Sequence, residues 1–240
     1  MILYSMTGHT HLNRFIAHRG VPSTHLENTL SSFLHAHALG MTEVEFDVRL
    51  SSCNTPVVIH DSTLLRTHGV GGVVSRMSAQ QLVDLGVPTL KEVVALLDTT
   101  NMHATVEIKS CSERALPDIV EMCLRGGHTL SSFEHDWLTQ ASLLSSDISL
   151  QCTLEKLDSD ASPFPAFVLD GRCAEIASDI RNTTPTGIAR ARALNCDVLA
   201  YTVKTKQQLK RAVDLGVDGI FVNDPISVRR WFEDSQQRVL

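Results

Sequence analysis

A segment of alternating charged and apolar residues, Glu43 to Leu50, is the part of this sequence best suited to hold a metal ion. Side chains two positions apart share one face of a strand, so Glu45 and Asp47 would project together. Two carboxylates buried side by side are costly unless a cation or hydrogen bonds compensate for their charge. Carboxylate oxygens are the ligands that Mg²⁺ and Ca²⁺ prefer. We therefore predict that Glu45 and Asp47 form half of a metal site.

Other residues with chemical potential lie at or near the ends of short apolar segments. They are His18 and Arg19 after residues 14–17, His60 after residues 57–59, and Glu107 and Lys109 on one face of residues 105–109. Three carboxylates suit a metal ion, and an arginine with a lysine suits a phosphate group. Two histidines can serve as general base and general acid on opposite sides of a phosphorus centre. Together these residues indicate metal-assisted cleavage of a phosphodiester.

The elements that must position these residues alternate between strand and helix. Strands are expected at residues 14–17, 43–50, 57–59, 105–109, 129–132, 148–154, 166–169, 198–203 and 219–222, with helices at 78–85, 90–97, 116–124, 136–144, 185–194, 206–215 and 225–232 and one from a cap at Asn28 or Thr29 to Gly40. This alternation predicts an α/β fold, a (β/α)₈ TIM barrel, in which chemistry occurs at the carboxyl ends of the strands. We expect a single domain over residues 1–240 with its core at 14–225. A short insertion, residues 61–88, would separate the second strand from the second helix.

Composition narrows the classes of partner and location. The chain has 240 residues, 43% of them hydrophobic, and a net charge of −6, which argues against a nucleic-acid partner. No apolar run is long enough to span a membrane, and the first fourteen residues contain no continuous apolar core of a signal peptide. Six scattered cysteines without a C-x-x-C pair indicate a reducing compartment. We expect a cytoplasmic protein acting on a small molecule, with its oligomeric state left open.

A set of short motifs in a fixed order connects the sequence to a known family. The motifs are Ile16-Ala17-His18-Arg19-Gly20, Glu27-Asn28-Thr29, Glu45-Phe46-Asp47-Val48-Arg49-Leu50, His60-Asp61, Leu65-Arg66-Thr67, Pro88-Thr89-Leu90, Glu107-Ile108-Lys109, Ser131-Ser132-Phe133, Tyr201-Thr202-Val203 and Gly216-Val217-Asp218-Gly219. With them the chain resembles the glycerophosphodiester phosphodiesterases, in particular the cytoplasmic bacterial members. The family usually has Trp-Thr-Val-Asn late in the chain, and here Tyr201 and Lys204 replace its ends.

The resemblance implies a barrel enzyme that uses Mg²⁺ or Ca²⁺ to release sn-glycerol 3-phosphate and an alcohol. It implies Glu45, Asp47 and Glu107 as metal ligands, His18 and His60 as the acid/base pair, Arg19 and Lys109 as phosphate contacts, and Glu27, Phe133 and Tyr201 as further substrate-site residues. Glu27 could equally orient Arg19 through a salt bridge, which we favour, and Phe133 could equally fill the barrel. Sequence alone does not order the roles of the two histidines.

Three other interpretations remain open. The pair His9 and His11 could bind a transition metal after a first barrel strand, although no convincing later ligand set accompanies it. A phospholipase D of the sphingomyelinase type would share this barrel and site, but such enzymes are typically secreted and disulfide-bonded. A non-catalytic barrel that only binds a phosphorylated ligand would be expected to have lost a histidine or a ligand, and all are retained.

Overall fold

Eight parallel strands form a closed barrel in this computed structural model, which describes residues 12–158 and 164–237. The ring closes because β1 pairs in parallel with both β2 and β9. Its strands are β1 (Arg14–His18), β2 (Glu43–Leu50), β4 (His103–Ile108), β5 (Thr129–Ser132), β6 (Ser149–Leu154), β7 (Glu175–Asp179), β8 (Asp197–Val203) and β9 (Gly219–Val222). This is the predicted (β/α)₈ TIM barrel. His9 and His11 lie outside the described residues.

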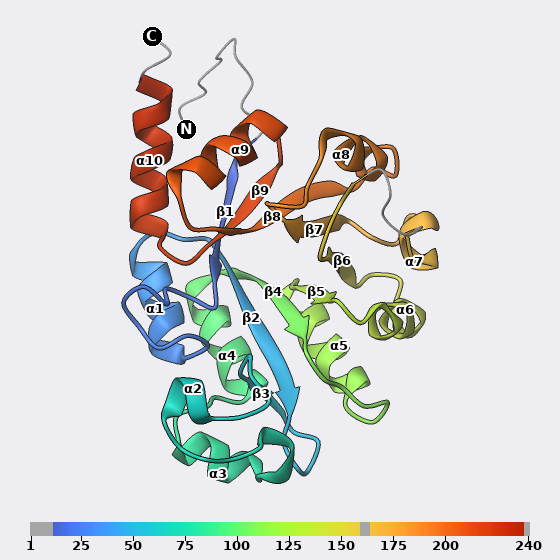
Figure 1. The fold of residues 1–240 in the computed structure, drawn as a ribbon. Coiled ribbons are helices and arrows are strands. Elements are labelled where there is room, and N and C mark those ends of the chain that lie inside the picture. The colour runs from blue at the N-terminus through green and yellow to red at the C-terminus, as the bar shows by residue number, and fades with distance from the viewer. Residues whose placement is uncertain (1–11, 159–163, 238–240) are drawn as a thin grey trace.

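Helices cover the outside of the barrel (Figure 1). They are α1 (Leu30–Ala38), α4 (Leu90–Thr100), α5 (Leu116–Gly126), α6 (His135–Leu144), α7 (Ala166–Leu169), α8 (Pro185–Arg192), α9 (Lys206–Leu215) and α10 (Pro225–Gln237). The apolar face of β2 packs outward against them, as the contact between the rings of Phe46 and Phe33 of α1 shows. Alternation along the strand therefore turns Glu45 and Asp47 toward the inside of the barrel.

The segment between β2 and α4 forms a small subassembly of its own beside the barrel (Figure 1). It contains β3 (Pro56–Val58), which runs antiparallel to β2, then α2 (Leu65–His68), the 3₁₀ helix η1 (Val74–Arg76) and α3 (Ala79–Asp84). Six buried apolar side chains, from Val57, Ile59, Leu64, Val74, Leu82 and Val87, form a separate hydrophobic cluster here. This packing fixes His60, which lies two residues after the end of β3 and directly follows the buried Ile59.

One predicted strand was wrong. Residues 166–169 form the short helix α7, and the strand in this part of the barrel is β7, Glu175–Asp179. A run of four apolar residues fits a buried helix as well as a strand, and Pro165 precedes this one as its N-cap. β7 was not predicted because its five residues include a single large apolar side chain, Ile176. Glu175 and Asp179 face the polar ends of the barrel, so the strand lacks the apolar pattern of its neighbours.

The inside of the barrel contains three successive layers along its axis: ion pairs, a small apolar cluster and an open pocket. At the amino ends of the strands, Arg14 is bonded to Glu43 and Glu175 and fills the lumen with ion pairs. A small apolar cluster of Ile16, Ala177, Leu199 and Phe221 lies above them. Beyond this plug, the carboxyl ends of the strands surround an open pocket, so the fold presents one face for chemistry.

Candidate active site

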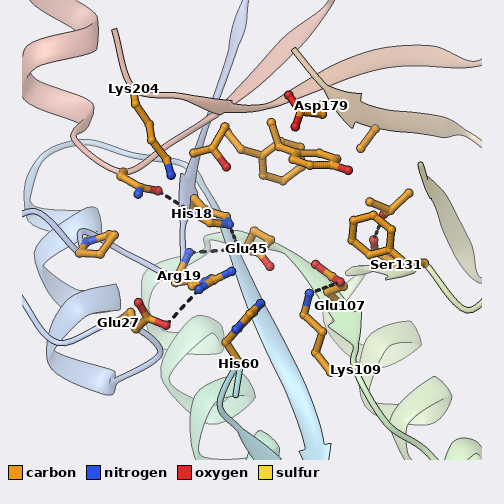
Figure 2. Close-up of a pocket in the computed structure, with 18 of the residues that line it drawn as sticks. His18, Arg19, Glu27, Glu45, His60, Glu107, Lys109, Ser131, Asp179 and Lys204 are labelled. Atoms are coloured by element: carbon orange, nitrogen blue, oxygen red, sulfur yellow. Dashed lines mark hydrogen bonds and ion pairs between the residues drawn. The ribbon is translucent and has the colours of Figure 1, made fainter. Parts of the chain in front are cut away.

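A pocket of about 570 Å³ opens at the carboxyl ends of the strands. All the predicted site residues except Asp47 line it, as Figure 2 shows for several of them: His18, Arg19, Glu27, Glu45, His60, Glu107, Lys109, Phe133 and Tyr201. Asp47 is fully buried, in contact with Arg19 and Lys109. The sequence therefore identified residues that the fold does bring together, from β1, β2, β4, β5, β8 and the start of the insertion.

Three carboxylates form the centre of the site. One oxygen each from Glu45, Asp47 and Glu107 lies within 4.8 Å of the others, and all three residues are buried. They converge because Asp47 and Glu107 are register partners on the adjacent strands β2 and β4, while Glu45 precedes Asp47 on the same face. Such a trio of oxygen donors can hold a divalent metal ion.

Two of the three carboxylates contact a positively charged side chain, and one oxygen of the third has no hydrogen-bond partner in the part of the chain that the structure describes. Arg19 Nε lies 3.1 Å from Asp47 Oδ2, and Lys109 Nζ contacts both Asp47 Oδ1 and Glu107 Oε1. Glu45 Oε1, in contrast, is buried without a hydrogen-bond partner among the described residues. An unpartnered buried carboxylate oxygen is costly unless a ligand satisfies it. The donor set and this oxygen both fit Mg²⁺ or Ca²⁺.

The electrostatics of the carboxylates agree with this fit. Burial, together with repulsion from Asp47 and Glu107, raises the pKa of Glu45 well above its usual range. Burial also raises the pKa of Glu107 to about 7, with Asp47 adding to the effect. Asp47 is buried too, but Arg19 and Lys109 outweigh the burial and lower its pKa. With all three carboxylates ionised, the trio would carry more negative charge than Arg19 and Lys109 compensate, and a divalent cation would favour that ionised form.

The turn after β1 explains why Arg19 can reach Asp47. Arg19 has φ +56° and Gly20 has φ +85°, and a Cβ on Gly20 would lie 2.2 Å from Ser32 Oγ. Ser32 Oγ instead accepts a hydrogen bond from the Val21 N–H at 2.7 Å. Only glycine permits this approach of the turn to α1. In the His18-Arg19-Gly20 motif, the glycine is therefore required by the backbone, while the histidine and the arginine supply side chains to the pocket.

Glu27 belongs to an ion-pair network at the pocket mouth, as the salt-bridge interpretation favoured. Its Oε1 accepts from Arg19 Nη1 at 3.0 Å and from Arg66 Nη2 at 2.6 Å. Arg66, on α2, also bonds to Asp61 at 2.6 Å. The network fastens the insertion to the turn after β1 and orients Arg19. Arg66 belongs to the motif Leu65-Arg66-Thr67, but its role in this network was not predicted from the sequence.

His18 is held in one tautomer. Its Nδ1 lies 2.7 Å from Asn223 Oδ1, which can only accept, so Nδ1 carries the proton and Nε2 presents a lone pair. Nε2 lies 3.8 Å from Glu45 Oε2, close to the carboxylate trio. Desolvation in the pocket, together with the Arg19 guanidinium, lowers the pKa of His18 to about 4. A neutral imidazole with a free Nε2 is suited to accept a proton.

His60 is oriented by a carboxylate. Its Nδ1 donates to Asp61 Oδ1 at 2.6 Å, which leaves Nε2 available to the pocket. Figure 2 shows His18 and His60 on different sides of Glu45. Desolvation lowers the pKa of His60, while Asp47 and Asp61 act in the opposite direction. The two imidazoles therefore have different partners: the amide of Asn223 orients His18, and the carboxylate of Asp61 orients His60.

The part of the pocket wall formed by Phe133, Tyr201 and the strands β5 and β6 is uncharged and partly aromatic. Phe133 lines the pocket at 37% exposure, and the Lys109 ammonium lies 5.3 Å from its ring centroid. Phe133 and Tyr201 meet edge to face, and the Tyr201 hydroxyl donates to the Leu154 carbonyl at 2.6 Å. Of the two interpretations of Phe133, the structure places it in the pocket. Ser131, Gln151 and Thr153 form the floor beside it.

Two residues that position the chemistry, Asn28 and Asn223, were not predicted to do so from the sequence. Asn28, at φ +59°, donates to Asp47 Oδ2 at 2.8 Å, and its left-handed backbone was not visible in the sequence. Asn223 directly follows β9, so its place at the carboxyl end of a barrel strand was the available signal.

Two global findings bear on the composition of the chain. All six cysteines are free thiols. Among the described residues, no helix is long and apolar enough to cross a membrane.

Comparison with known proteins extends the match beyond the site. The sequence profile of the glycerophosphoryl diester phosphodiesterase family matches residues 18–227. Glycerophosphodiester phosphodiesterases from Caldanaerobacter subterraneus subsp. tengcongensis and Bacillus altitudinis are 28% and 26% identical, covering 88% and 89% of this chain and 93% and 96% of theirs.

Solved structures show the same fold. A phosphodiesterase of Oleispira antarctica, in complex with the product sn-glycerol-3-phosphate, superposes with a TM-score of 0.79 at 22% identity, covering 92% of this chain and 97% of that one. A glycerophosphodiester phosphodiesterase of Thermotoga maritima gives 0.74 at 22% identity, covering 91% and 96%. The family match, the barrel and the composition of its pocket agree, and the chain therefore belongs to the glycerophosphoryl diester phosphodiesterase family.

Proposed function

We propose that this protein hydrolyses glycerophosphodiesters to sn-glycerol 3-phosphate and an alcohol with the help of a divalent metal ion and two histidines. The observation that carries the proposal is the convergence of Glu45, Asp47 and Glu107 beside His18 and His60 at one pocket. The relative from Oleispira antarctica is described in complex with sn-glycerol-3-phosphate, which supports a substrate of this class.

The carboxylates of Glu45, Asp47 and Glu107 would hold the metal ion. A bound Mg²⁺ or Ca²⁺ would supply positive charge for a phosphoryl oxygen of the substrate. The chain's own cations extend this field, since Arg19 and Lys109 flank Asp47 and reach the pocket. An arginine held at both Glu27 and Asp47 keeps its guanidinium in place when a phosphate enters. Lys109, packed against Phe133, positions the same phosphate from the other side.

The two histidines would divide the proton transfers. His18 Nε2, with Nδ1 committed to Asn223, accepts the proton of the attacking group, either water or the substrate's own 2-hydroxyl. His60, oriented by Asp61, donates a proton to the leaving alkoxide. The anionic diester favours the charged form of His60 when it binds nearby. Family resemblance orders the roles in this way, and the tautomer of His18 supports the order.

The test is an analysis of products as well as of rate. We would incubate the protein with choline, ethanolamine, glycerol and inositol glycerophosphodiesters, with Mg²⁺, with Ca²⁺ and with chelator, and assay glycerol 3-phosphate by a coupled enzyme. Release that needs a divalent ion and identifies glycerol 3-phosphate supports the proposal. Turnover of sphingomyelin or of an acylated lysophospholipid with none of the four deacylated diesters cleaved would favour the phospholipase D alternative. Tight binding without turnover would favour a non-catalytic barrel.

Three further expectations remain predictions of the sequence. The scattered cysteines without a C-x-x-C pair favour a reducing compartment such as the cytoplasm, and the continuous alternation of elements favours a single domain. The short insertion at residues 61–88 predicts loose selection of the alcohol. A ratio of kcat/KM above roughly a hundredfold between choline and ethanolamine diesters, about 2.7 kcal/mol, would contradict an open site.

A further inference from the structure

Lys204 differs from the other cations of the pocket because it has no carboxylate partner. Arg19, Arg66, Lys109 and Arg181 each form ion pairs with acidic side chains. Among the pocket-lining residues that the structure describes, Lys204 is the lysine or arginine for which no such pair is found. Its ammonium is therefore free to pair with an anion that enters the pocket.

The backbone at Lys204 is fixed although its side chain is unpaired. The Lys204 N–H donates to Gln208 Oε1 at 2.9 Å, one turn into α9, and the Thr205 side chain caps that helix. No acidic residue lies in the first turn of α9, so nothing there neutralises the positive helix end beside Lys204. Figure 2 shows the side chain extending from the end of β8 into the pocket, with its ammonium toward His18.

The acidic residue nearest in the pocket wall is already engaged. Asp179, at the end of β7, accepts from Arg181 Nε and Nη2 through both of its oxygens. Arg181 is largely exposed whereas Asp179 is mostly buried, and both line the pocket. Both oxygens of Asp179 are therefore occupied by Arg181, whose hydrogen bonds lower the pKa of Asp179, and Lys204 adds only a smaller long-range contribution to that effect.

Lys204 also lies on the opposite side of the ring from β4. Around the eight-stranded ring, β8 lies four strands from β4 in either direction, so Lys204 faces Glu107 and Lys109 from across the mouth. A phosphate held by the trio and by Arg19 and Lys109 would occupy one side of the pocket. A cation on the other side would meet whatever else the substrate carries there.

We propose that Lys204 forms a second anion subsite and that the preferred substrates are diesters with an acidic group in addition to the reacting phosphate. The inference rests on the proposed phosphodiesterase function and narrows its substrate class. The acidic group is a carboxylate or phosphate on one of the two esterified alcohols. Both sources offer the same chemistry to Lys204, and they can be separated by experiment.

The experiment uses two matched pairs of synthetic diesters and the intact protein. The first pair shares the glycerol and has ethanol or glycolate as leaving alcohol, so the second member adds a carboxylate to the leaving side. The second pair shares ethanol as leaving alcohol and has glycerol or glycerate on the retained side. The acid-to-neutral ratio of kcat/KM is measured in each pair for the wild type, Lys204→Gln, Lys204→Glu and Lys206→Gln. Lys206 is the matched control, because it is exposed two residues further on and does not line the pocket.

We expect Lys204→Gln to lower the acid-to-neutral ratio about threefold to fivefold in one pair, consistent with an exposed ion pair. Lys204→Glu should lower it further, Lys206→Gln should leave it unchanged, and added salt should weaken the wild-type preference. The pair that responds identifies which alcohol carries the anion.

Three results would overturn the inference while leaving the proposed function intact. The ratio could stay constant in both pairs, all four diesters could lose rate equally because Lys204 contacts the reacting phosphate, or Lys206→Gln could match Lys204→Gln. A wild type that cleaves none of the four diesters would instead overturn the proposed function and the inference with it.

Discussion

The two halves of the barrel mouth differ in charge although they share one pocket. The half formed by β1, β2, β4 and the insertion carries the carboxylate trio, both histidines and three of the paired cations. The half formed by β5, β6 and β7 presents the uncharged side chains of Ser131, Gln151, Thr153 and Ala177, and its two charged residues, Asp179 and Arg181, pair with each other. We infer that the first half performs the chemistry and that the second half, with the β8 wall, shapes the space for the alcohols.

The neutral half is ordered by its own hydrogen bonds. Ser131 Oγ lies 2.7 Å from Thr153 Oγ1 and donates to Gln151 Oε1 at 3.2 Å. Gln151 Nε2 in turn donates to Glu175 at 2.8 Å, deeper in the barrel. These residues satisfy one another without a ligand, whereas Glu45 Oε1 on the charged side does not find a partner. Unsatisfied groups therefore concentrate where a metal is expected to bind, which is typical of functional sites.

The largest effect should come from the charged half. Glu45→Gln keeps the size of the side chain and removes a ligand charge, and we expect it to lower kcat/KM by at least about a thousandfold, roughly 4 kcal/mol. Glu43→Gln is the control, since Glu43 lies on the same face of β2 but bonds to Arg14 at the other end of the barrel. The comparison between the halves would fail if both variants lost activity alike.

His60→Ala should lose less than Glu45→Gln, and its loss should depend on the leaving group. An alkyl diester needs a proton donor for its alkoxide, so we expect a loss of about 10²–10⁴-fold, the usual range for general acid catalysis. A nitrophenyl diester needs no acid, and its loss should stay below about tenfold. His18→Ala should lose comparably on both substrates. Equal losses for His60→Ala would refute its role as the donor, and the opposite pattern would exchange the two roles.

A substitution in the neutral half should change binding with little change in turnover. Phe133→Leu keeps an apolar side chain but removes the ring beside Lys109, an interaction worth about 0.5–1 kcal/mol. We expect KM to rise about twofold to fivefold with kcat nearly constant, measured on the choline diester. A tenfold fall in kcat at unchanged KM would show that this half takes part in the chemistry.

The smallest effect should appear in the stability of the protein kept in chelator. Glu107 has a folded pKa of about 7 against an ordinary value near 4.5, so the folded chain binds a proton that the unfolded chain has released. The contribution of Glu107 to the free energy of unfolding is therefore greatest below about pH 4.5, and it is lost as the pH rises toward 7. Thermal unfolding between pH 5 and 8 should show a declining Tm in chelator.

Two controls accompany this measurement. Glu107→Gln should flatten the decline, because it removes the titrating group. Saturating Mg²⁺ should also flatten it, because a bound cation favours the ionised carboxylate. A Tm that does not change with pH in chelator would show that the carboxylates are stabilised by the protein alone.

The charged half was predictable from sequence, and the neutral half mostly was not. Alternation along Glu43–Leu50 placed Glu45 and Asp47 on one face, and ordered motifs connected them to His18, His60 and Glu107. Ser131 and Thr153 carry no such signal, since small hydroxyl residues are common in any strand. β7 was misplaced for a related reason, because its polar alternate positions face the lumen and pocket.

Partners of the chemical residues were also hidden from the sequence. Asn223 lies 205 positions from His18, and their contact depends on β9 pairing with β1 to close the barrel. Asn28 reaches Asp47 only because its backbone is left-handed. Such contacts follow from tertiary closure and local backbone conformation, which hydrophobic periodicity does not report.

The central claim is that the carboxylates of β2 and β4 hold one divalent ion on which turnover depends. The most direct measurement is to titrate the chelated, desalted wild type with Mg²⁺ or Ca²⁺ while recording both bound ion per chain by calorimetry and the rate of glycerol 3-phosphate release. We predict that activity rises from background in proportion to occupancy of a single site, and that Glu45→Gln shows neither strong binding nor activity. Full activity in the presence of chelator, with no ion bound, would contradict the account.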